Sequence, residues 1–479
     1  MKTRQRGRLF LGCGLLFIVA FVAGIFGTQA LTGTGIFYVP GIVTYDESLN
    51  EAEKEVLAGI FTEDVRIDAD VSISAAEYSE KPELSEGEFL YDILVPVTDF
   101  YSVLTEAGSE QDFISVSALD ATKKLLKYEG KYYLDDFVSG ARFRVIKFSS
   151  EKYAEEIAPL VSERFSKTWP DENSVLTFAQ TGVTALSRGM NRKLYSVNDA
   201  TYFSENIAEY LKSFDLTHTS NESSFSNGAS GANICSDPRF KSTLLDIGLD
   251  IVELTGNHNL DCGDAAAKET IDFYNENGIL AVGGGKTAEE AAQAITISKK
   301  GTNITMFAYN LSTGGATYDQ TPGANQYYEE KAAAEIAEAK ARGDFVIVDV
   351  QYYECNAYAS KYEDPICDRA DSAAGDQIGF FRHLIDLGAD VVVGTSAHQP
   401  QTFELYNEGA IYYGLGNLFF DQVWWPGTTR SLVLEHYFYN GKLLQTRIQP
   451  TVYGNEMQVK LMDEETTKWF LERLISVKP

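Results

Sequence analysis

Apolar and polar positions alternate with two different periods along the chain after its first third. From residue 175 onward, short apolar runs typical of buried strands alternate with longer segments whose apolar residues recur every three or four positions. The predicted strands are Val175–Ala179, Leu216–Thr219, Ile251–Leu254, Ile304–Tyr309, Phe345–Gln351 and Val391–Val393. The predicted helices are Tyr202–Phe214, Ala265–Asn277, Glu329–Arg342, Gln377–Leu387 and Thr466–Ile475. This alternation indicates an α/β fold with a largely buried sheet and crossover helices.

Two hairpins follow the last of these strands. Each joins a pair of strand-like runs through a three-residue turn that contains Asn and Gly. The paired runs are Thr402–Tyr406 with Ala410–Tyr413, and Ser431–Tyr439 with Leu443–Gln449. Together with the alternating elements they predict one domain, residues 173–455, followed by a closing C-terminal helix in residues 456–479.

The segment before this domain, residues 36–172, has a different pattern. Acidic stretches such as Glu47–Glu55 are mixed with strand-like runs at Ile93–Val97 and Phe143–Phe148, and a helix-like segment, Lys152–Phe165, comes near its end. No catalytic constellation occurs there. We therefore expect a small accessory α/β domain that positions the next domain or binds a wall component.

The N-terminus has the pattern of a membrane anchor. Leu9–Ala30 contains no charged residue, and its 22 residues are enough to span a bilayer as a helix. Four Lys or Arg residues precede it and the next charge is Asp46, so residues 1–35 are predicted to be a cytoplasmic tail and transmembrane helix. The protein would then be single-pass in the cell membrane, with its bulk extracellular. A cleaved signal peptide is the alternative, although Thr28-Gln29-Ala30 is a poor cleavage site.

Composition bears on the choice of partners. The formal net charge is −29, which argues against nucleic acid, because nucleic-acid binding needs a basic face. The same charge disfavours direct docking on anionic lipid headgroups. Association with the membrane is therefore expected through the single N-terminal helix.

Four cysteines lie beyond the predicted anchor, and an even number in an oxidising compartment suggests disulfides. Three pairings are open to four cysteines. The predicted pairing joins Cys235 to Cys262, which each follow a candidate strand at one sheet edge, and Cys355 to Cys367, which bracket one loop. The alternative is buried free thiols. Metal binding by these cysteines is not expected, because no Cys-x-x-Cys spacing occurs.

The polar residues after the Ile251–Leu254 strand are the first candidates for chemistry. Asn257, His258, Asn259 and Asp261 lie between this strand and the next helix, where open α/β sheets bind their ligands. An amide oxygen and an imidazole side by side can serve a metal ion or a phosphate. The alternative is a capped turn in which Asn257 and Asp261 hold backbone amides.

A second polar group accompanies the Val391–Val393 strand and the hairpin after it. His398 follows the strand, Glu404 opens the hairpin, and Asn417 ends a Gly-Leu-Gly-Asn run. So many polar residues in loops at strand ends favour one shared site at an edge of the sheet.

These stretches resemble the poly-γ-glutamate capsule-synthesis (CapA-type) family, whose domain is related to calcineurin-like metallophosphoesterases. The stretches that carry the resemblance are Gly256–Gly263, Gly388–Gly394 with His398, and Tyr413–Asp421. The resemblance covers residues 175–449 and implies an α/β fold of the metallophosphoesterase-like type, an α-β-β-α sandwich. The transmembrane helix and the small accessory α/β domain would precede it.

The family resemblance implies metal ligands from several strand ends, and this chain matches only part of that set. Glu222, Asn257, His258 and His398 match, and Arg188 matches a basic residue after the opening motif. Where the family has an acid or a histidine, this chain has the neutral residues Val183, Gln351, Thr395 and Ser396. A two-metal centre needs an anionic bridging ligand and several imidazoles. We therefore expect at most one divalent ion (Mn, Fe or Zn), or none.

The resemblance also implies roles for the matching residues. In a hydrolase or transferase, Glu222 and His258 would be base and acid, with Arg188 and His398 on an anionic substrate group. The expected metal ligands are Glu222, Asn257 and His398, and the expected substrate-binding residues are Asn257, Asp261, Glu404 and Asn417.

Two functions of different class follow. In one, the protein is a degenerate family member that binds a cell-envelope or capsule polymer of poly-γ-glutamate type, or its assembly proteins. In the other, it is a single-metal hydrolase, phosphoesterase or transferase that acts on such a polymer. The missing ligands favour the first, because a fold does not by itself carry a function.

Overall fold

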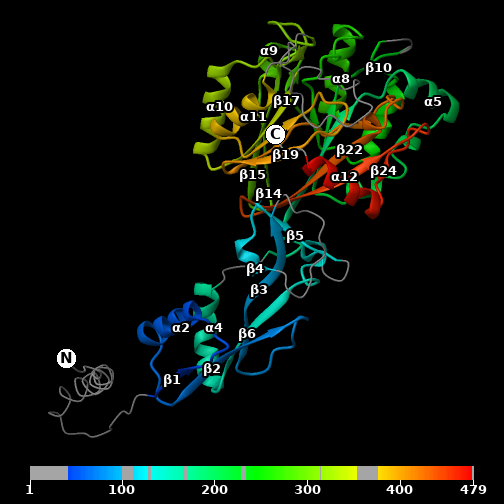
Figure 1. Cartoon of the computed structure of the whole chain (residues 1–479). Coiled ribbons are helices and arrows are strands. Elements are labelled where there is room, and N and C mark those ends of the chain that lie inside the picture. The colour runs from blue at the N-terminus through cyan, green and yellow to red at the C-terminus, as the bar shows by residue number, and fades with distance from the viewer. Residues whose placement is uncertain are drawn as a thin grey trace, which may run out of the picture. The chain divides into compact units, whose positions relative to one another are not determined.

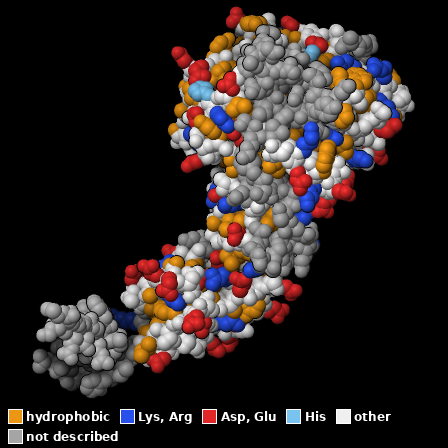
Figure 2. Space-filling view, in the orientation of Figure 1, with side chains coloured by type: hydrophobic (Ala, Val, Ile, Leu, Met, Phe, Trp, Pro, Cys, Tyr) orange, Lys and Arg blue, Asp and Glu red, His pale blue; other side chains and the backbone are white. Residues whose placement is uncertain are grey.

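The computed structural model describes residues 41–99, 112–127, 131–165, 170–227, 233–312, 314–352 and 376–476 (Figure 1). The predicted transmembrane helix and the predicted disulfide between Cys355 and Cys367 lie outside these residues. Within them, no helix combines the length and the apolar character needed to cross a membrane. On the face shown in Figure 2, Lys and Arg side chains are interspersed with Asp and Glu and gather in no single basic patch.

The described residues form two compact units. The smaller takes its described residues from Met1–Ala76, Leu84–Phe89 and Ile146–Phe165. The larger takes its described residues from Glu77–Glu83, Leu90–Val145 and Ser166–Pro479. Neither unit is one continuous segment, because the chain passes from one to the other more than once.

The smaller unit contains a parallel strand pair and two helices that pack against each other. Its elements are β1 (Val43–Tyr45), α2 (Glu51–Glu63), most of β2 (Val71–Tyr78) and α4 (Glu151–Phe165). The hydrophobic pattern did not predict α2, because its start lies in an acidic stretch. A capping box fixes that start: Asn50 Oδ1 accepts from the amide of Glu53, and the Glu53 carboxylate accepts from the amide of Asn50.

The larger unit begins with short strands that pack directly on the domain that follows. Its first elements, wholly or in part, are β3 (Glu88–Asp99), β4 (Phe113–Ser115), β5 (Lys123–Leu125), α3 (Tyr133–Asp136) and β6 (Arg142–Phe148). Strand β3 pairs antiparallel with β4 and β5. The buried side chains of Val95 and Phe143 share one apolar cluster with Val175, Tyr437 and Leu444.

Two mixed sheets make up the rest of the larger unit. In spatial order, the first contains β12 (Leu280–Val282), β11 (Ile251–Glu253), β8 (Leu216–Asn221), β7 (Leu176–Thr184), β22 (Arg430–Tyr439), β23 (Lys442–Val452) and β24 (Lys460–Leu461), with β21 (Asn417–Phe419) paired to β7. The second contains β14 (Ile295–Lys299), β15 (Thr302–Asn310), β17 (Phe345–Gln351), β18 (Val391–Gly394), β20 (Gly409–Tyr412) and β19 (Phe403–Tyr406). Strands β12, β11, β8 and β7 run parallel, as do β15, β17, β18 and β20.

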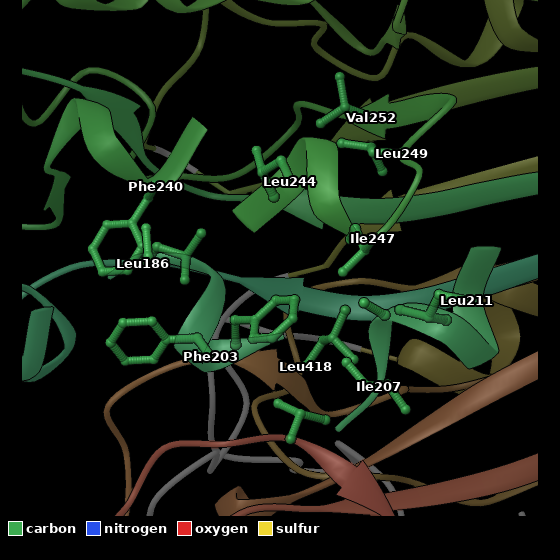
Figure 3. Packing of buried hydrophobic residues seen from close by; sticks show 14 of the residues in the cluster. Leu186, Phe203, Ile207, Leu211, Phe240, Leu244, Ile247, Leu249, Val252 and Leu418 are labelled. Carbon is green, nitrogen blue, oxygen red and sulfur yellow. The ribbon is translucent and has the colours of Figure 1, made fainter. Parts of the chain in front are cut away.

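Helices cover the outer face of each sheet, which confirms the predicted α/β class. The helices on the first sheet are α5 (Gly189–Val197), α6 (Ala208–Lys212), α7 (Lys241–Asp246) and α8 (Asp264–Glu276), and those on the second are α10 (Glu329–Ala341) and α11 (Gln377–Asp386). Phe203, Leu244 and Leu418 pack in the first of these helix–sheet layers (Figure 3). A separate cluster, which includes Met306 and Leu434, fills the space between the sheets.

Smaller elements complete the domain. They are β9 (Ser224–Phe225), β10 (Cys235–Ser236), β13 (Gly284–Gly285), α9 (Ala288–Ala291), β16 (Gly323–Ala324) and α12 (Glu464–Ser476). The helix predicted over Tyr202–Phe214 is wrong in extent, since only a 3₁₀ turn and the short α6 form there. The Ser204 hydroxyl bonds the carbonyl of Thr201 and the carboxylate of Asp246, which ends the turn.

A chain of buried polar side chains crosses the apolar core between the sheets. Its members are Lys124, Thr446, His436, Gln180, Asp349 and His218. Lys124 Nζ donates to the carbonyl of Thr446, and Thr446 Oγ1 lies 2.8 Å from His436 Nδ1. Gln180 lies 3.2 Å from His436 Nε2 and donates to Asp349 at 2.7 Å. Asp349 Oδ2 then lies 3.1 Å from His218 Nε2.

Burial determines the protonation of this chain. It lowers the pKa of His436 to about 3, so the imidazole is neutral, with Nε2–H donating to Gln180 and Nδ1 accepting from Thr446. Burial also lowers the pKa of Lys124 to about 7. At the other end, burial and then the charge of Asp349 raise the pKa of Glu253. Its member Asp349 lies on β17, two residues before Gln351, and its last member His218 lies on β8.

Candidate functional site

The carboxyl ends of parallel strands from both sheets bring the predicted polar residues to one edge of the sandwich. In the first sheet, Val183 on β7 lies opposite Ser220 on β8 and Asn417 on β21. In the second sheet, Gln351 ends β17 and Thr395 follows β18. These are the positions at which open α/β sheets bind ligands.

Asn257, Gln351 and Thr395 form a hydrogen-bonded bridge between the two sheets. Gln351 Nε2 donates to Asn257 Oδ1 at 3.2 Å, and Thr395 Oγ1 donates to Gln351 Oε1 at 3.5 Å. The side chains of Gln351 and Thr395 are buried. The Asn257 oxygen that the family resemblance assigns to a metal ion therefore accepts a hydrogen bond from a neutral amide.

His258 is oriented by the loop that carries it. Its Nδ1 lies 3.2 Å from Asp261 Oδ2, and that oxygen also accepts from the amide of Ile234 at 3.0 Å. The next residue, Cys262, is bonded to Cys235, which confirms this predicted disulfide. The carboxylate assigns the proton to Nδ1 and makes Nε2 the accepting nitrogen. Asp261 thus has an orienting contact, and its role in substrate binding stays a prediction.

His398 is buried and held by Asn417. Its Nδ1 lies 2.9 Å from Asn417 Oδ1, while Asn417 Nδ2 donates to Gln422 and to the carbonyl of Thr428. The imidazole packs against the ring of Phe420, with centroids 5.2 Å apart. The predicted metal ligand and the predicted substrate-binding amide are therefore hydrogen-bonded neighbours.

Arg188 also contacts the Phe420 ring, with its guanidinium 4.7 Å from the ring centroid. Its guanidinium is paired with Asp421, with Nη2 and Oδ1 2.5 Å apart, and Asp421 also accepts from the amide of Gly189 at the start of α5. Arg188 has φ 49°, a left-handed conformation that non-glycine residues rarely adopt. Asp421 therefore occupies the place beside Arg188 that the sequence assigned to an anionic substrate group.

Glu222 follows β8 and is buried, and its amide donates to the carbonyl of Thr184 at 2.9 Å. The loop that begins at Gly256 passes directly over it. A Cβ at position 256 would lie 2.7 Å from the Glu222 Cα, closer than such atoms approach. Glycine at this position therefore allows Asn257 and His258 to reach the same edge as Glu222.

Glu404 is engaged elsewhere. Arg382 on α11 holds its carboxylate through two hydrogen bonds of 2.8 and 2.7 Å, and the Tyr413 hydroxyl donates to it as well. In the described part of the chain these two residues are the polar partners of its side chain. Its evident contribution is to fix α11 against the second sheet.

The donor set of this edge does not fit the two-metal centre that the family resemblance implies. Among the described residues, no three His, Cys, Asp or Glu side chains converge as a metal site requires. Val183 offers no donor atom, and Gln351 and Thr395 are bonded to each other. A bridging anion and the extra imidazoles are missing from these positions.

Sequence reasoning missed the role of Asp421. The residue ends the Tyr413–Asp421 run, which was a signal that it belongs to the edge. Its partner Arg188 is 233 positions away in sequence, however, so the pairing had no local pattern. The same holds for Phe420, whose ring contacts both Arg188 and His398.

The fold and this edge define a two-sheet α/β domain with a polar edge at the ends of its parallel strands. The family model described as bacterial capsule synthesis protein PGA_cap matches residues 177–422, and the chain belongs to this family. The CapA-type assignment made from the sequence motifs is thereby confirmed.

Three relatives illustrate the similarity. The capsule biosynthesis protein CapA of Bacillus anthracis is 22% identical over 284 residues, 56% of this chain and 66% of that protein. The PGA biosynthesis protein CapA of Bacillus subtilis (strain 168) is 29% identical over 201 residues, 41% of this chain and 50% of that protein. A probable polyglutamine synthesis accessory protein of Mycobacterium tuberculosis (strain ATCC 25618 / H37Rv) is 25% identical over 236 residues, 47% and 57% of the two chains. The matches span from half to about two thirds of these relatives.

Proposed function

We propose that this protein is a membrane-anchored, extracytoplasmic CapA-type protein that binds a cell-envelope or capsule polymer, of poly-γ-glutamate type, or its assembly proteins. Its metallophosphoesterase-like domain would serve recognition rather than two-metal hydrolysis. The observation that carries this proposal is the bridge of Asn257, Gln351 and Thr395, which puts neutral hydrogen bonds where such a domain would need metal ligands. The polymer class is suggested by two of the relatives, a capsule biosynthesis protein and a PGA biosynthesis protein.

The chemistry of the edge suits an amide polymer. Asn257, which is half-buried, presents an amide group that can bond the N–H and C=O groups of a polyamide chain. The buried amides of Gln351 and Asn417 are bonded to Asn257 and His398 and support this edge from inside. His258 adds an imidazole with 27% of its side chain exposed. Because the whole chain carries −29, a polyanion needs bridging cations to approach it.

Binding of the full-length protein in detergent to immobilised poly-γ-glutamate, measured by biolayer interferometry, tests the proposal. We expect saturable binding that falls at least fivefold in Asn257→Ala. Asn275→Ala, an exposed amide on α8, is the matched control and should bind as the wild type does. Two equivalents of bound metal per chain, together with turnover of a phosphodiester, would overturn the recognition role.

A second candidate function is hydrolysis or group transfer with one metal ion or none. The His258–Asp261 pair favours it, because an oriented imidazole on the loop that passes over the buried Glu222 suits acid–base catalysis. Turnover of bis(p-nitrophenyl) phosphate with and without added manganese separates the two functions. Activity that is lost in His258→Ala supports the enzyme, and no activity under either condition supports recognition.

The anchor is part of the proposal and has its own test. The uncharged stretch Leu9–Ala30 behind four basic residues supports a cytoplasmic N-terminus and an extracellular bulk. Protease added to intact cells or spheroplasts should digest the bulk of the protein. Protection of the residues after Gly35 would contradict this topology.

A further inference from the structure

A cavity of about 480 Å³ opens on the larger unit at the opposite end of the first sheet from the candidate site. Val175 and Asp215, which line it, precede β7 and β8, whereas the candidate site lies beyond the ends of those strands. Its floor includes Glu435, Tyr437 and Arg447 on β22 and β23. The volume lies within the range of small-molecule sites, about 300–1,000 Å³.

The floor of this cavity is polar and contains charged side chains that lie deep in the sheet. Glu435 is buried, yet it accepts hydrogen bonds from the hydroxyls of Tyr210 at 2.7 Å and Tyr437 at 3.0 Å. Arg447 Nε lies 3.3 Å from the same carboxylate. Two positions away on β22, Val433 packs in the apolar helix–sheet cluster. Burying charged side chains this deeply costs free energy, so we interpret this polar cluster as part of a binding site.

Two charged groups of opposite sign around the cavity have unused bonding capacity. Arg447 Nε contacts the carboxylate of Glu435, and Nη1 donates to Asp135 and to the Tyr437 hydroxyl. Its Nη2 has no polar partner in the described part of the chain. Within the same residues, the exposed carboxylate of Glu172 has no partner either. The remaining charged pair of the lining is satisfied, since Lys300 is paired with Asp215 at 2.7 Å.

We propose that this cavity binds a small zwitterion, an amino acid or dipeptide, with its carboxylate on Arg447 and its ammonium on Glu172. The planar guanidinium suits a carboxylate, and the free Nη2 is the group that can receive it. Leu134, Phe137 and Phe214 supply apolar and aromatic wall for a side chain. A simple anion or a simple amine satisfies only one of the two groups and binds more weakly. The site is independent of the polymer-binding role proposed above.

Calorimetry on the full-length protein in detergent tests this with three probes: alanyl-phenylalanine, its N-acetyl derivative and its C-terminal amide. We expect the free dipeptide to bind at least tenfold more tightly than either capped form. Glu172→Gln should reduce dipeptide binding at least fivefold and leave the N-acetyl form unchanged, because that form has no ammonium. Glu472→Gln, an exposed acid on α12, should change neither.

Arg447→Lys keeps a positive charge but removes the Nη2 donors, and we expect it to bring dipeptide binding down to the level of the amide. Circular dichroism and the melting temperature check that this variant is folded. If Arg447→Lys is not folded, binding of the dipeptide and of its N-acetyl form to Glu172→Gln still tests the proposal. No saturation by the dipeptide up to about 10 mM, or equal binding of all three probes, would refute the zwitterion site.

Discussion

At the scale of single residues, Asp261 decides which nitrogen of His258 carries the proton. Its carboxylate lies 3.2 Å from Nδ1, so that nitrogen is the donor. Asp261→Ala should shift the neutral imidazole toward the Nε2–H tautomer, because the acceptor at Nδ1 is lost. We expect about 1 kcal/mol of destabilisation from the lost hydrogen bonds.

Nitrogen-15 NMR of the imidazole, recorded above the titration of the ring, reports the tautomer of His258 directly. Glu269→Ala on α8 is the control, because its side chain is exposed and lies one turn beyond the loop. Unchanged ring shifts in Asp261→Ala would show that the carboxylate does not orient the imidazole.

The hydrogen-bonded bridge of Asn257, Gln351 and Thr395 gives a second prediction at the scale of single residues. Val183→Asp, Gln351→His and Thr395→His together return a carboxylate and two imidazoles to one edge, so bound metal should rise from at most one equivalent to two. Losing one supporting group around a metal costs about 10–100-fold in affinity, so three changes together have a large effect. The metal-free triple variant should melt at a lower temperature than wild type, because a buried carboxylate lacks its ion, and added manganese should restore stability.

Elemental analysis without chelator and melting curves with manganese measure this outcome. The matched control replaces the same three positions with Asn, which adds no anion and no imidazole. A wild-type chain that already holds two equivalents would contradict the bridge interpretation. Other side chains, such as Asp261 or Glu354, would then have to serve as replacement ligands.

At the scale of elements, apolar runs in the sequence predicted the strands well. The sequence did not predict which polar side chains bond one another. The predicted strand Phe345–Gln351 matches β17 residue for residue, because a fully buried parallel strand is a continuous apolar run. The polar chain through the core could not be predicted in the same way. Gln180 bonds Asp349 across 169 positions of sequence, and nothing in either strand's own pattern marks the partner.

The residues of the candidate site show the same difference between local patterns and long-range contacts. Asn257, His258 and Asp261 were predictable because one short loop holds them after one strand. The bridge from Asn257 to Gln351 depends on two sheets meeting at their edges, with the residues 94 positions apart in sequence. The pairing of Glu404 with Arg382 also joins two different elements, while the role of Glu404 in substrate binding stays a prediction. Local chemistry is therefore readable in the sequence, whereas contacts between sheets need the fold.

The disulfide is an element-level restraint on the loop between β11 and α8. It joins Cys235 to Cys262 across 27 positions, and a crosslink of that span stabilises by about 3–4 kcal/mol in the chain-entropy model. Cys235→Ser with Cys262→Ser should lower the melting temperature and increase hydrogen exchange at the amides of Ile234 and Asp261. Equal exchange in the presence and absence of the crosslink would mean that the hydrogen bonds alone fix this loop.

The buried Lys124 predicts a pH dependence of stability. Burial lowers its pKa to about 7 in the folded protein, against 10.5 for an ordinary lysine. Between these values the unfolded chain holds the proton and the folded one does not, so the free energy of unfolding should rise with pH from about 7 to 10.5. The gain is at most about 5 kcal/mol over the window.

Urea midpoints at pH 7, 8, 9 and 10 measure this slope. Lys124→Met should flatten it, because the titrating group is gone, while the exposed Lys468→Met on α12 should leave it unchanged. His436 does not interfere, because its lowered pKa of about 3 puts its own contribution between pH 3 and 6.5. A slope that persists in Lys124→Met would assign the pH dependence to other groups.

At the scale of the whole molecule, the net charge of −29 sets how a polyanionic partner can approach. Repulsion slows association at low ionic strength, and salt screens it over a Debye length of about 8–10 Å. Binding of poly-γ-glutamate should therefore strengthen severalfold as sodium chloride is raised. It should strengthen more with magnesium or calcium chloride at equal ionic strength, because a divalent ion can bridge carboxylates on both partners. Biolayer interferometry of the full-length protein in the two salt series, matched in ionic strength, gives the comparison. Binding that weakens as salt rises would mean that a basic surface makes the contact, and the amide and imidazole edge at Asn257 and His258 would then not be the polymer site.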